Sequence, residues 1–101
     1  MEYLVDFRVT VPAGAPPAEV REREAGETTR VAELAREGHA LRVWRPLPVP
    51  EDGSTRVFGL YRADSDAQLR EILDSLPLAP WMDMAVTPLQ EHPNDPGRSA
   101  T

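Results

Sequence analysis

The sequence contains neither cysteine nor lysine among its 101 residues, and each absence excludes a kind of chemistry. Without cysteine there can be no disulfide, no thiolate metal ligand and no cysteine nucleophile. Without lysine there can be no lysine Schiff base, and all eleven basic residues are arginines. An arginine keeps its proton, so it is suited to binding carboxylates and unsuited to exchanging protons. Proton chemistry must therefore come mainly from carboxylates, from Tyr3 and Tyr61, or from the two histidines, His39 and His92.

Long hydrophobic runs and an excess of positive charge are also missing. No apolar run approaches the roughly 20 residues of a membrane span, and the N-terminus lacks the basic segment and apolar stretch of a signal peptide. The net charge is −6 and the sequence pI is about 4.8, which argues against a general nucleic-acid binder. No spacing of His, Asp and Glu resembles a metal site. We expect a cytoplasmic protein that binds no nucleic acid, no membrane and no metal.

What the sequence does contain is a pattern of strands and helices in the order βαββαβ. Residues 2–11 alternate apolar and polar side chains, as a strand with one buried face does. The whole pattern predicts strands at 2–11, 40–45, 56–61 and 82–87, with helices at 18–37 and from Ser65 to Leu76. Pro46, Pro48 and Pro50 follow the second strand at alternate positions, which fits an edge strand because proline has no N–H to donate. This order predicts an α+β, ferredoxin-like fold with a four-stranded antiparallel sheet.

The first predicted helix carries two carboxylates in the middle of its most apolar stripe. At about 100° per residue, five side chains fall within about 80° of one another. They are Val20, Glu24, Glu27, Val31 and Leu34. If this stripe faces the sheet, burial favours a carboxylate with a raised pKa, which is suited to act as a general base. The alternative is a helix on which Glu24 and Glu27 are both solvated.

Three side chains on the second and third predicted strands are candidates for binding a small molecule. Arg45 ends the second strand, where its guanidinium could hold a substrate carboxylate through two parallel hydrogen bonds. A salt bridge to a helix carboxylate is the alternative. Trp44 and Tyr61 are candidate pocket walls, with packing in the core as their alternative.

Four stretches of the sequence, spread over nearly the whole chain, carry specific local signatures. They are Glu-Leu-Ala-Arg-Glu-Gly (33–38), Val-Trp-Arg (43–45), Leu-Pro-Leu-Ala-Pro-Trp-Met-Asp (76–83) and Val-Thr-Pro-Leu-Gln-Glu-His-Pro (86–93). In this order they resemble the muconolactone isomerase family. The resemblance implies a ferredoxin-like domain at 1–89 that forms a dimeric α/β barrel or a larger ring. It also implies that residues 90–101 are a C-terminal arm that reaches a neighbouring subunit, with a flexible tail as the alternative.

The resemblance also implies a reaction and a place in aromatic catabolism. Muconolactone isomerases move a double bond within an unsaturated lactone that bears a carboxylate, by removing a C–H proton and returning a proton two carbons away. This chemistry needs a base, a hydrogen-bond donor for the dienolate oxygen and a group that binds the substrate carboxylate, but no cofactor. We assign Glu27 as the base and Arg45 as the group that binds the carboxylate or stabilises the dienolate. Further candidates for contact with the substrate are Glu24, Trp44, Tyr61 and His92; an intersubunit structural role is the alternative for His92.

The chain departs from the usual family pattern at three places. Glu24 stands where the first helix usually carries a lysine, Arg70 stands where the second helix usually has a histidine, and the connection 46–55 is several residues longer. A related isomerase or cyclase that acts on another enolisable molecule is therefore a strong alternative. An enzyme of polyketide-type substrates, or a non-catalytic protein that binds a ligand or assembles, also stays open. A cavity shared by Glu27 and Arg45 would favour an enzyme.

Overall fold

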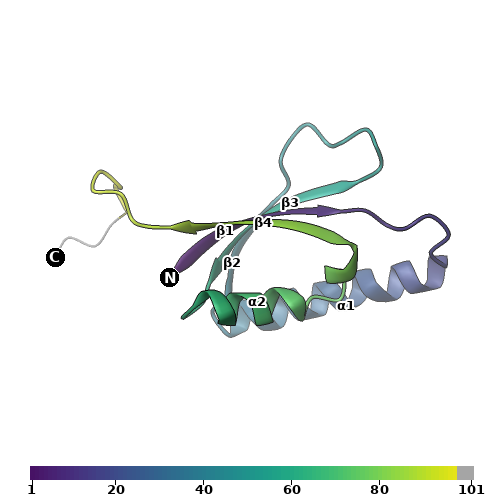
Figure 1. The fold of residues 1–101 in the computed structure, drawn as a ribbon, viewed down its shortest axis with the longest axis horizontal. Helices are drawn as coiled ribbons and strands as arrows, with labels where there is room; N and C mark the ends of the chain where they lie inside the picture. Colours follow the sequence, from purple (N-terminus) through teal and green to yellow (C-terminus); the bar gives the residue numbers. More distant parts are fainter. Residues whose placement is uncertain (98–101) are drawn as a thin grey trace.

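The computed structural model describes residues 1–97 and has the element order that the sequence predicts (Figure 1). The strands are β1 (Glu2–Val9), β2 (Ala40–Trp44), β3 (Thr55–Arg62) and β4 (Met82–Leu89). The helices are α1 (Pro17–Arg36), α2 (Asp66–Asp74) and the short 3-10 helix η1 (Ala79–Trp81). The predicted α+β, ferredoxin-like fold is confirmed. The last part of the predicted arm, residues 98–101, lies outside the described residues.

The four strands form one antiparallel sheet in the order β2-β3-β1-β4. β1 lies inside the sheet and pairs with both neighbours, so that Val5 is opposite Gly59 of β3 and Val86 of β4. β2 lies at an edge, where a chain can run on into prolines without losing hydrogen bonds to a further strand. The edge position predicted for this strand is therefore confirmed.

α1 and α2 cover the same face of the sheet and leave the other face open (Figure 1). Tyr3, Val5 and Phe7 of β1 point toward the helices at alternate positions, and each is at most 2% exposed. The helices and the turn after α2 supply Leu34, Leu69, Ile72, Leu73 and Leu76 to the same core. The apolar side chains of the second helix therefore pack against the sheet.

The ends of the helices follow local signals in the sequence. α1 begins with Pro17, whose missing N–H is not needed in the first turn. It ends before Gly38, which has a φ of +85°, a left-handed conformation that glycine adopts without strain. α2 begins after Ser65, whose hydroxyl accepts a hydrogen bond from the N–H of Gln68.

A β-bulge decides which side chains of β2 face the helices. The register with β3 shifts between Ala40 and Arg42, so Leu41 is an extra residue on β2. An extra residue reverses the alternation of side chains between the two faces of a strand. As a consequence, Arg45 lies toward the helices and Trp44 lies toward the open face.

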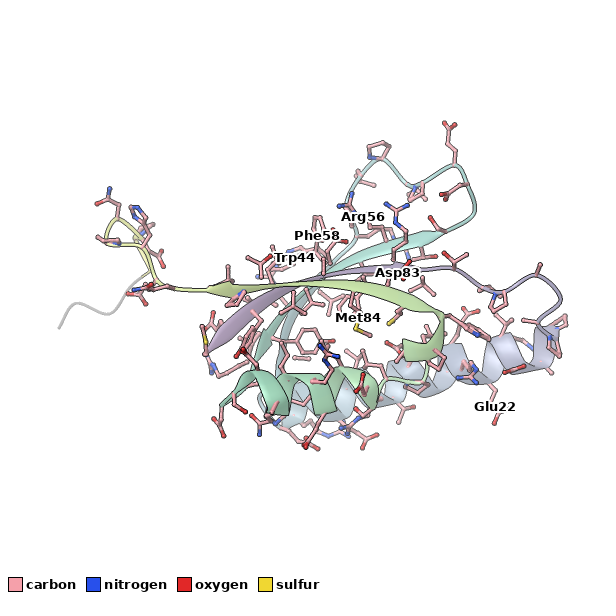
Figure 2. The ribbon with its side chains drawn as sticks, in the orientation of Figure 1. Glu22, Trp44, Arg56, Phe58, Asp83 and Met84 are labelled. Carbon is pink, nitrogen blue, oxygen red and sulfur yellow. The ribbon has the colours of Figure 1, made fainter. Side chains whose placement is uncertain are left out.

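The open face of the sheet carries aromatic and charged side chains. Trp44, Arg56 and Phe58 lie on the side away from the helices, whereas Met84 points toward the helices (Figure 2). Trp44 is directly opposite Phe58, and Arg56 forms an ion pair with Asp6 at 2.8 Å. Trp44 is 40% exposed, so a large apolar side chain on this face is in contact with solvent.

Candidate active site

A cavity of about 350 Å³ lies between α1 and the sheet, near the end of β1 and the start of β3. Its apolar lining residues are Phe7, Val9, Val11, Val31, Val43, Val57, Leu78 and Met82. Its polar lining residues are Glu24, Glu27, Arg45, Thr55 and Tyr61. A mostly apolar cavity of this size with a few converging polar groups is the usual form of a site for a small molecule. Glu27 and Arg45 share this cavity, which is the arrangement that favours an enzyme.

Glu27 enters the cavity from the middle of α1 with one carboxylate oxygen held and the other open. Its Oε1 accepts a hydrogen bond from the backbone N–H of Leu78 at 3.0 Å. Its Oε2 has no hydrogen-bond partner among residues 1–97. Burial raises the pKa of Glu27, and the bond from Leu78 opposes part of this rise because it stabilises the ionised form. The carboxylate is therefore fixed in position and can accept a proton at Oε2.

Tyr61 enters the same cavity from β3, and its side chain is almost entirely buried. Its hydroxyl has no hydrogen-bond partner among residues 1–97. In this part of the chain no fully buried side-chain oxygen or nitrogen lacks a partner, so the hydroxyl must face open space in the cavity. Burial and the nearby charge of Glu27 raise the pKa of Tyr61 to about 12. The phenol is therefore protonated near neutral pH and can donate a hydrogen bond to a bound molecule.

Arg45 and Glu24 line the more exposed side of the cavity. Arg45 directly follows the last residue of β2, and Glu24 lies three residues before Glu27 on α1. Neither side chain forms an ion pair with any of the residues 1–97. The guanidinium is therefore available to bind an anionic group on a ligand.

The structure places two predicted site residues outside this cavity. Trp44 lies on the open face of the sheet, because adjacent residues of a strand point in opposite directions and Arg45 takes the inward one. The expectation that Trp44 forms a wall of the same pocket as Arg45 is therefore corrected. His92 follows β4 and lies near Met1 and Arg62, at the opposite end of the sheet from the cavity. Within one chain it therefore lies outside the cavity that Glu27 and Arg45 share.

The segment between α2 and β4 contributes to the site in a way that the sequence did not indicate. The N–H of Leu78 holds Glu27, and the carbonyl oxygen of Pro77 accepts a hydrogen bond from Arg23 at 2.7 Å. The family-like stretch 76–83 marks this segment as special, but a backbone N–H is carried by every residue except proline. No sequence pattern could therefore have singled out Leu78 as the partner of Glu27.

Among residues 1–97, no three side chains of His, Cys, Asp or Glu form a group that could hold a metal ion. No helix in this part of the chain combines the length and apolar character that crossing a membrane requires.

The fold and the cavity together are those of a small ferredoxin-like enzyme that acts on small molecules. Comparison with known proteins identifies its family. Residues 1–95 match the family model of muconolactone delta-isomerase. The muconolactone delta-isomerases of Cupriavidus pinatubonensis and Rhodococcus opacus are each 31% identical to the chain, over 93% and 92% of its length and 97% and 95% of theirs. A crystal structure of muconolactone isomerase matches with a TM-score of 0.84 and 28% identity, covering 98% of each chain. The chain therefore belongs to the muconolactone delta-isomerase family and is an isomerase.

Proposed function

We propose that this protein is a cofactor-independent isomerase that moves a double bond in a small unsaturated lactone, or in a related enolisable carboxylate, by carrying a proton on Glu27. The observation that carries the proposal is that only one oxygen of the Glu27 carboxylate is hydrogen-bonded within residues 1–97 of the protein. Oε1 is fixed by Leu78, while Oε2 is open to a cavity that also contains Arg45 and Tyr61. The names of the relatives support a lactone as the class of substrate.

The reaction needs only one proton carrier. Oε2 of Glu27 removes a proton from the saturated carbon beside the double bond that is conjugated with the lactone carbonyl. The electron pair of the broken C–H bond moves through the double bond to the carbonyl oxygen and gives a dienolate. Glu27, now a carboxylic acid, returns the proton to a carbon two positions away, and the carbonyl re-forms. Glu27 ends as the carboxylate it began as, so no cofactor is required.

Two donors complete the site in this proposal. Tyr61 is buried and protonated, so we assign its hydroxyl to the dienolate oxygen, where a preorganised donor stabilises the developing charge. Arg45 lies on the more exposed side, so we assign it to the substrate carboxylate. Glu24 lies near the same entrance, and its negative charge would disfavour a substrate with a second anionic group.

We also propose that a second copy covers the open face of the sheet. A chain of this size buries a limited fraction of its surface on its own, and Trp44 and Phe58 offer an apolar centre for a two-fold contact. The arm 90–101 would then reach a neighbouring subunit and bring His92 with it. Removal of residues 90–101 should weaken the assembly and lower its melting temperature. An unchanged oligomer with unchanged melting would contradict this role of the arm.

The base is tested by changing Glu27→Gln and following deuterium uptake from solvent into muconolactone and related unsaturated lactones. The amide is nearly isosteric, so the fold should be kept. Exchange should fall by about 10² to 10⁴-fold, the usual contribution of a positioned base. Glu22→Gln is the matched control, because Glu22 lies on the same helix and points away from the sheet (Figure 2). It should keep the wild-type rate.

The outcome decides between Glu27 and other bases. If the wild-type protein catalyses exchange and Glu27→Gln does so equally well, Glu27 is not the base. Arg45→Lys then separates two roles of the guanidinium: a loss of carboxylate binding raises KM, and a loss of dienolate stabilisation lowers kcat. Our assignment of Arg45 to the carboxylate predicts the first result.

A further inference from the structure

One turn of α1 holds a single peptide group of the neighbouring segment from both of its ends. The peptide that joins Pro77 to Leu78 presents its carbonyl oxygen to Nη1 of Arg23 at 2.7 Å. The same peptide presents its N–H to Oε1 of Glu27 at 3.0 Å. Residues four apart on a helix lie above one another on one face, so Arg23 and Glu27 can bind the two ends together.

We infer that Arg23 is a positioning residue for Glu27 and acts through the peptide group that joins Pro77 to Leu78. The inference rests on the proposed role of Glu27 as the base. Arg23 itself is not among the residues that line the cavity, so it does not contact a bound substrate there. Its influence on the reaction must therefore pass through Glu27.

The physical basis is polarisation of the shared peptide. A cation at the carbonyl oxygen withdraws electron density from the amide, so the N–H becomes a stronger donor. Hydrogen bonds to charged groups are shorter and roughly twice as strong as neutral ones, and bonds in a chain strengthen one another by about 10–30% each. Arg23 should therefore strengthen the bond that fixes Oε1 of Glu27, and with it the ionised form of that carboxylate.

The surroundings of Arg23 keep its guanidinium in one place. It lies 4.9 Å from the ring centroid of Trp81, and its Nε donates to Glu19 at 3.2 Å. Gly26 lies between Arg23 and Glu27 on α1, and a Cβ added there would be 3.2 Å from Cγ of Pro77. The absence of a side chain at Gly26 therefore allows the segment to approach α1 closely enough for both bonds.

Other charged or titratable groups also face Glu27, and the test must separate them from Arg23. Those on the cavity wall are Glu24, Arg45 and Tyr61. Arg30 lies three residues after Glu27 on α1 and donates to the hydroxyl of Ser75 at 2.9 Å. Arg30 is thus a matched control, since it joins the same helix to the same segment without touching the peptide that holds Glu27.

The experiment compares Arg23→Gln, Arg23→Lys and Arg30→Gln with the wild-type protein. The carboxyl ¹³C signal of Glu27, assigned by its absence in Glu27→Gln, is titrated in the protein without substrate, and the amide proton shift of Leu78 is recorded. Arg23→Gln should raise the pKa of Glu27 and move the Leu78 signal upfield. Arg23→Lys keeps the charge but loses the planar fork, so it should give a smaller change. Arg30→Gln should change neither.

Unchanged signals of Glu27 and Leu78 in both Arg23 variants would overturn the inference, as would equal changes in Arg30→Gln. If Arg23→Gln does not fold, Arg23→Lys against Arg30→Gln decides alone. The pH profile of deuterium exchange separates this inference from the proposed function. If Glu27 is the base, the acidic limb of kcat/KM moves with its pKa. A shifted Glu27 with an unshifted limb would support the role of Arg23 and overturn Glu27 as the base.

Discussion

Tyr61 and Glu27 enter one cavity from opposite layers, the phenol from β3 and the carboxylate from α1. Burial and the charge of Glu27 hold the pKa of Tyr61 at about 12, and burial also raises the pKa of Glu27. Near neutral pH the carboxylate can therefore accept a proton while the phenol keeps its own. Two neighbouring groups whose environments give them different protonation states are suited to act as base and donor in one reaction.

Tyr61→Phe should keep the fold and lower the turnover rate. The change removes only the hydroxyl, which has no hydrogen-bond partner among residues 1–97, so stability should change little. If the hydroxyl stabilises the dienolate, kcat should fall by about 10²-fold, with a smaller effect on KM. Steady-state kinetics beside thermal melting measure both effects. A variant with wild-type kcat would show that Tyr61 only forms part of the wall.

The element order and the edge position of β2 were predictable because they depend on local signals such as proline spacing and the period of apolar residues. The orientation of Arg45 and Trp44 was not. Alternation shows that neighbours point apart, but the bulge at Leu41 decides which of the two faces the helices. A bulge is fixed by pairing with a distant strand, so the short sequence 40–45 does not contain that information.

The candidate site was predictable to a similar depth. The stripe on α1 placed Glu24 and Glu27 on the face toward the sheet, and both line the cavity. The sequence could not show that Glu27 is held by a backbone N–H or that Glu24 remains exposed. Both facts depend on how far the segment before β4 approaches one end of the helix, which is a property of tertiary packing.

Gly59→Ala should disturb the core and the site together. Gly59 lies two residues before Tyr61 on the same face of β3, and an added Cβ would be 2.6 Å from Cε1 of Tyr61 and 3.1 Å from Cε2 of Phe7. Both rings would have to move, so we expect a loss of about 1–3 kcal/mol in the free energy of unfolding. Urea unfolding measures the loss. Gly97→Ala, where the nearest atom would be 3.5 Å away, is the control; equal stability of the two variants would contradict the close packing of Tyr61.

Glu27→Gln should be more stable than the wild-type protein at neutral pH. The pKa of Glu27 is raised above 4.5 by folding, so the folded state binds the proton more tightly than the unfolded state does. The stability that this proton gives is present below 4.5 and is lost as the pH rises through the folded pKa. Glutamine is neutral at every pH, so the variant does not lose this stability as the pH rises. The variant should therefore gain stability at about pH 7 and little at about pH 4.

Urea unfolding of Glu27→Gln at the two pH values checks this expectation. Glu22→Gln is the control and should have the stability of the wild-type protein at both pH values. A Glu27→Gln variant no more stable than wild type at about pH 7 would show that its carboxylate is held mainly for structure. A gain in stability together with a loss of activity is the usual signature of a charged group that is kept for function.

Trp44→Arg should dissociate the oligomer while leaving the fold of the chain intact. Trp44 is opposite Phe58 on the open face and takes no part in the core beneath the helices, so a charge there should act on the contact between copies. Light scattering at micromolar concentration should give at least twice the 11.2 kDa of one chain for the wild-type protein and a value near 11.2 kDa for the variant.

Leu47→Arg is the matched control, because Leu47 is 80% exposed in the connection between β2 and β3 and does not belong to the sheet. It should keep the wild-type mass. A wild-type protein that scatters as a monomer would contradict the proposed dimer, and a Trp44→Arg variant with the wild-type mass would move the contact to another surface.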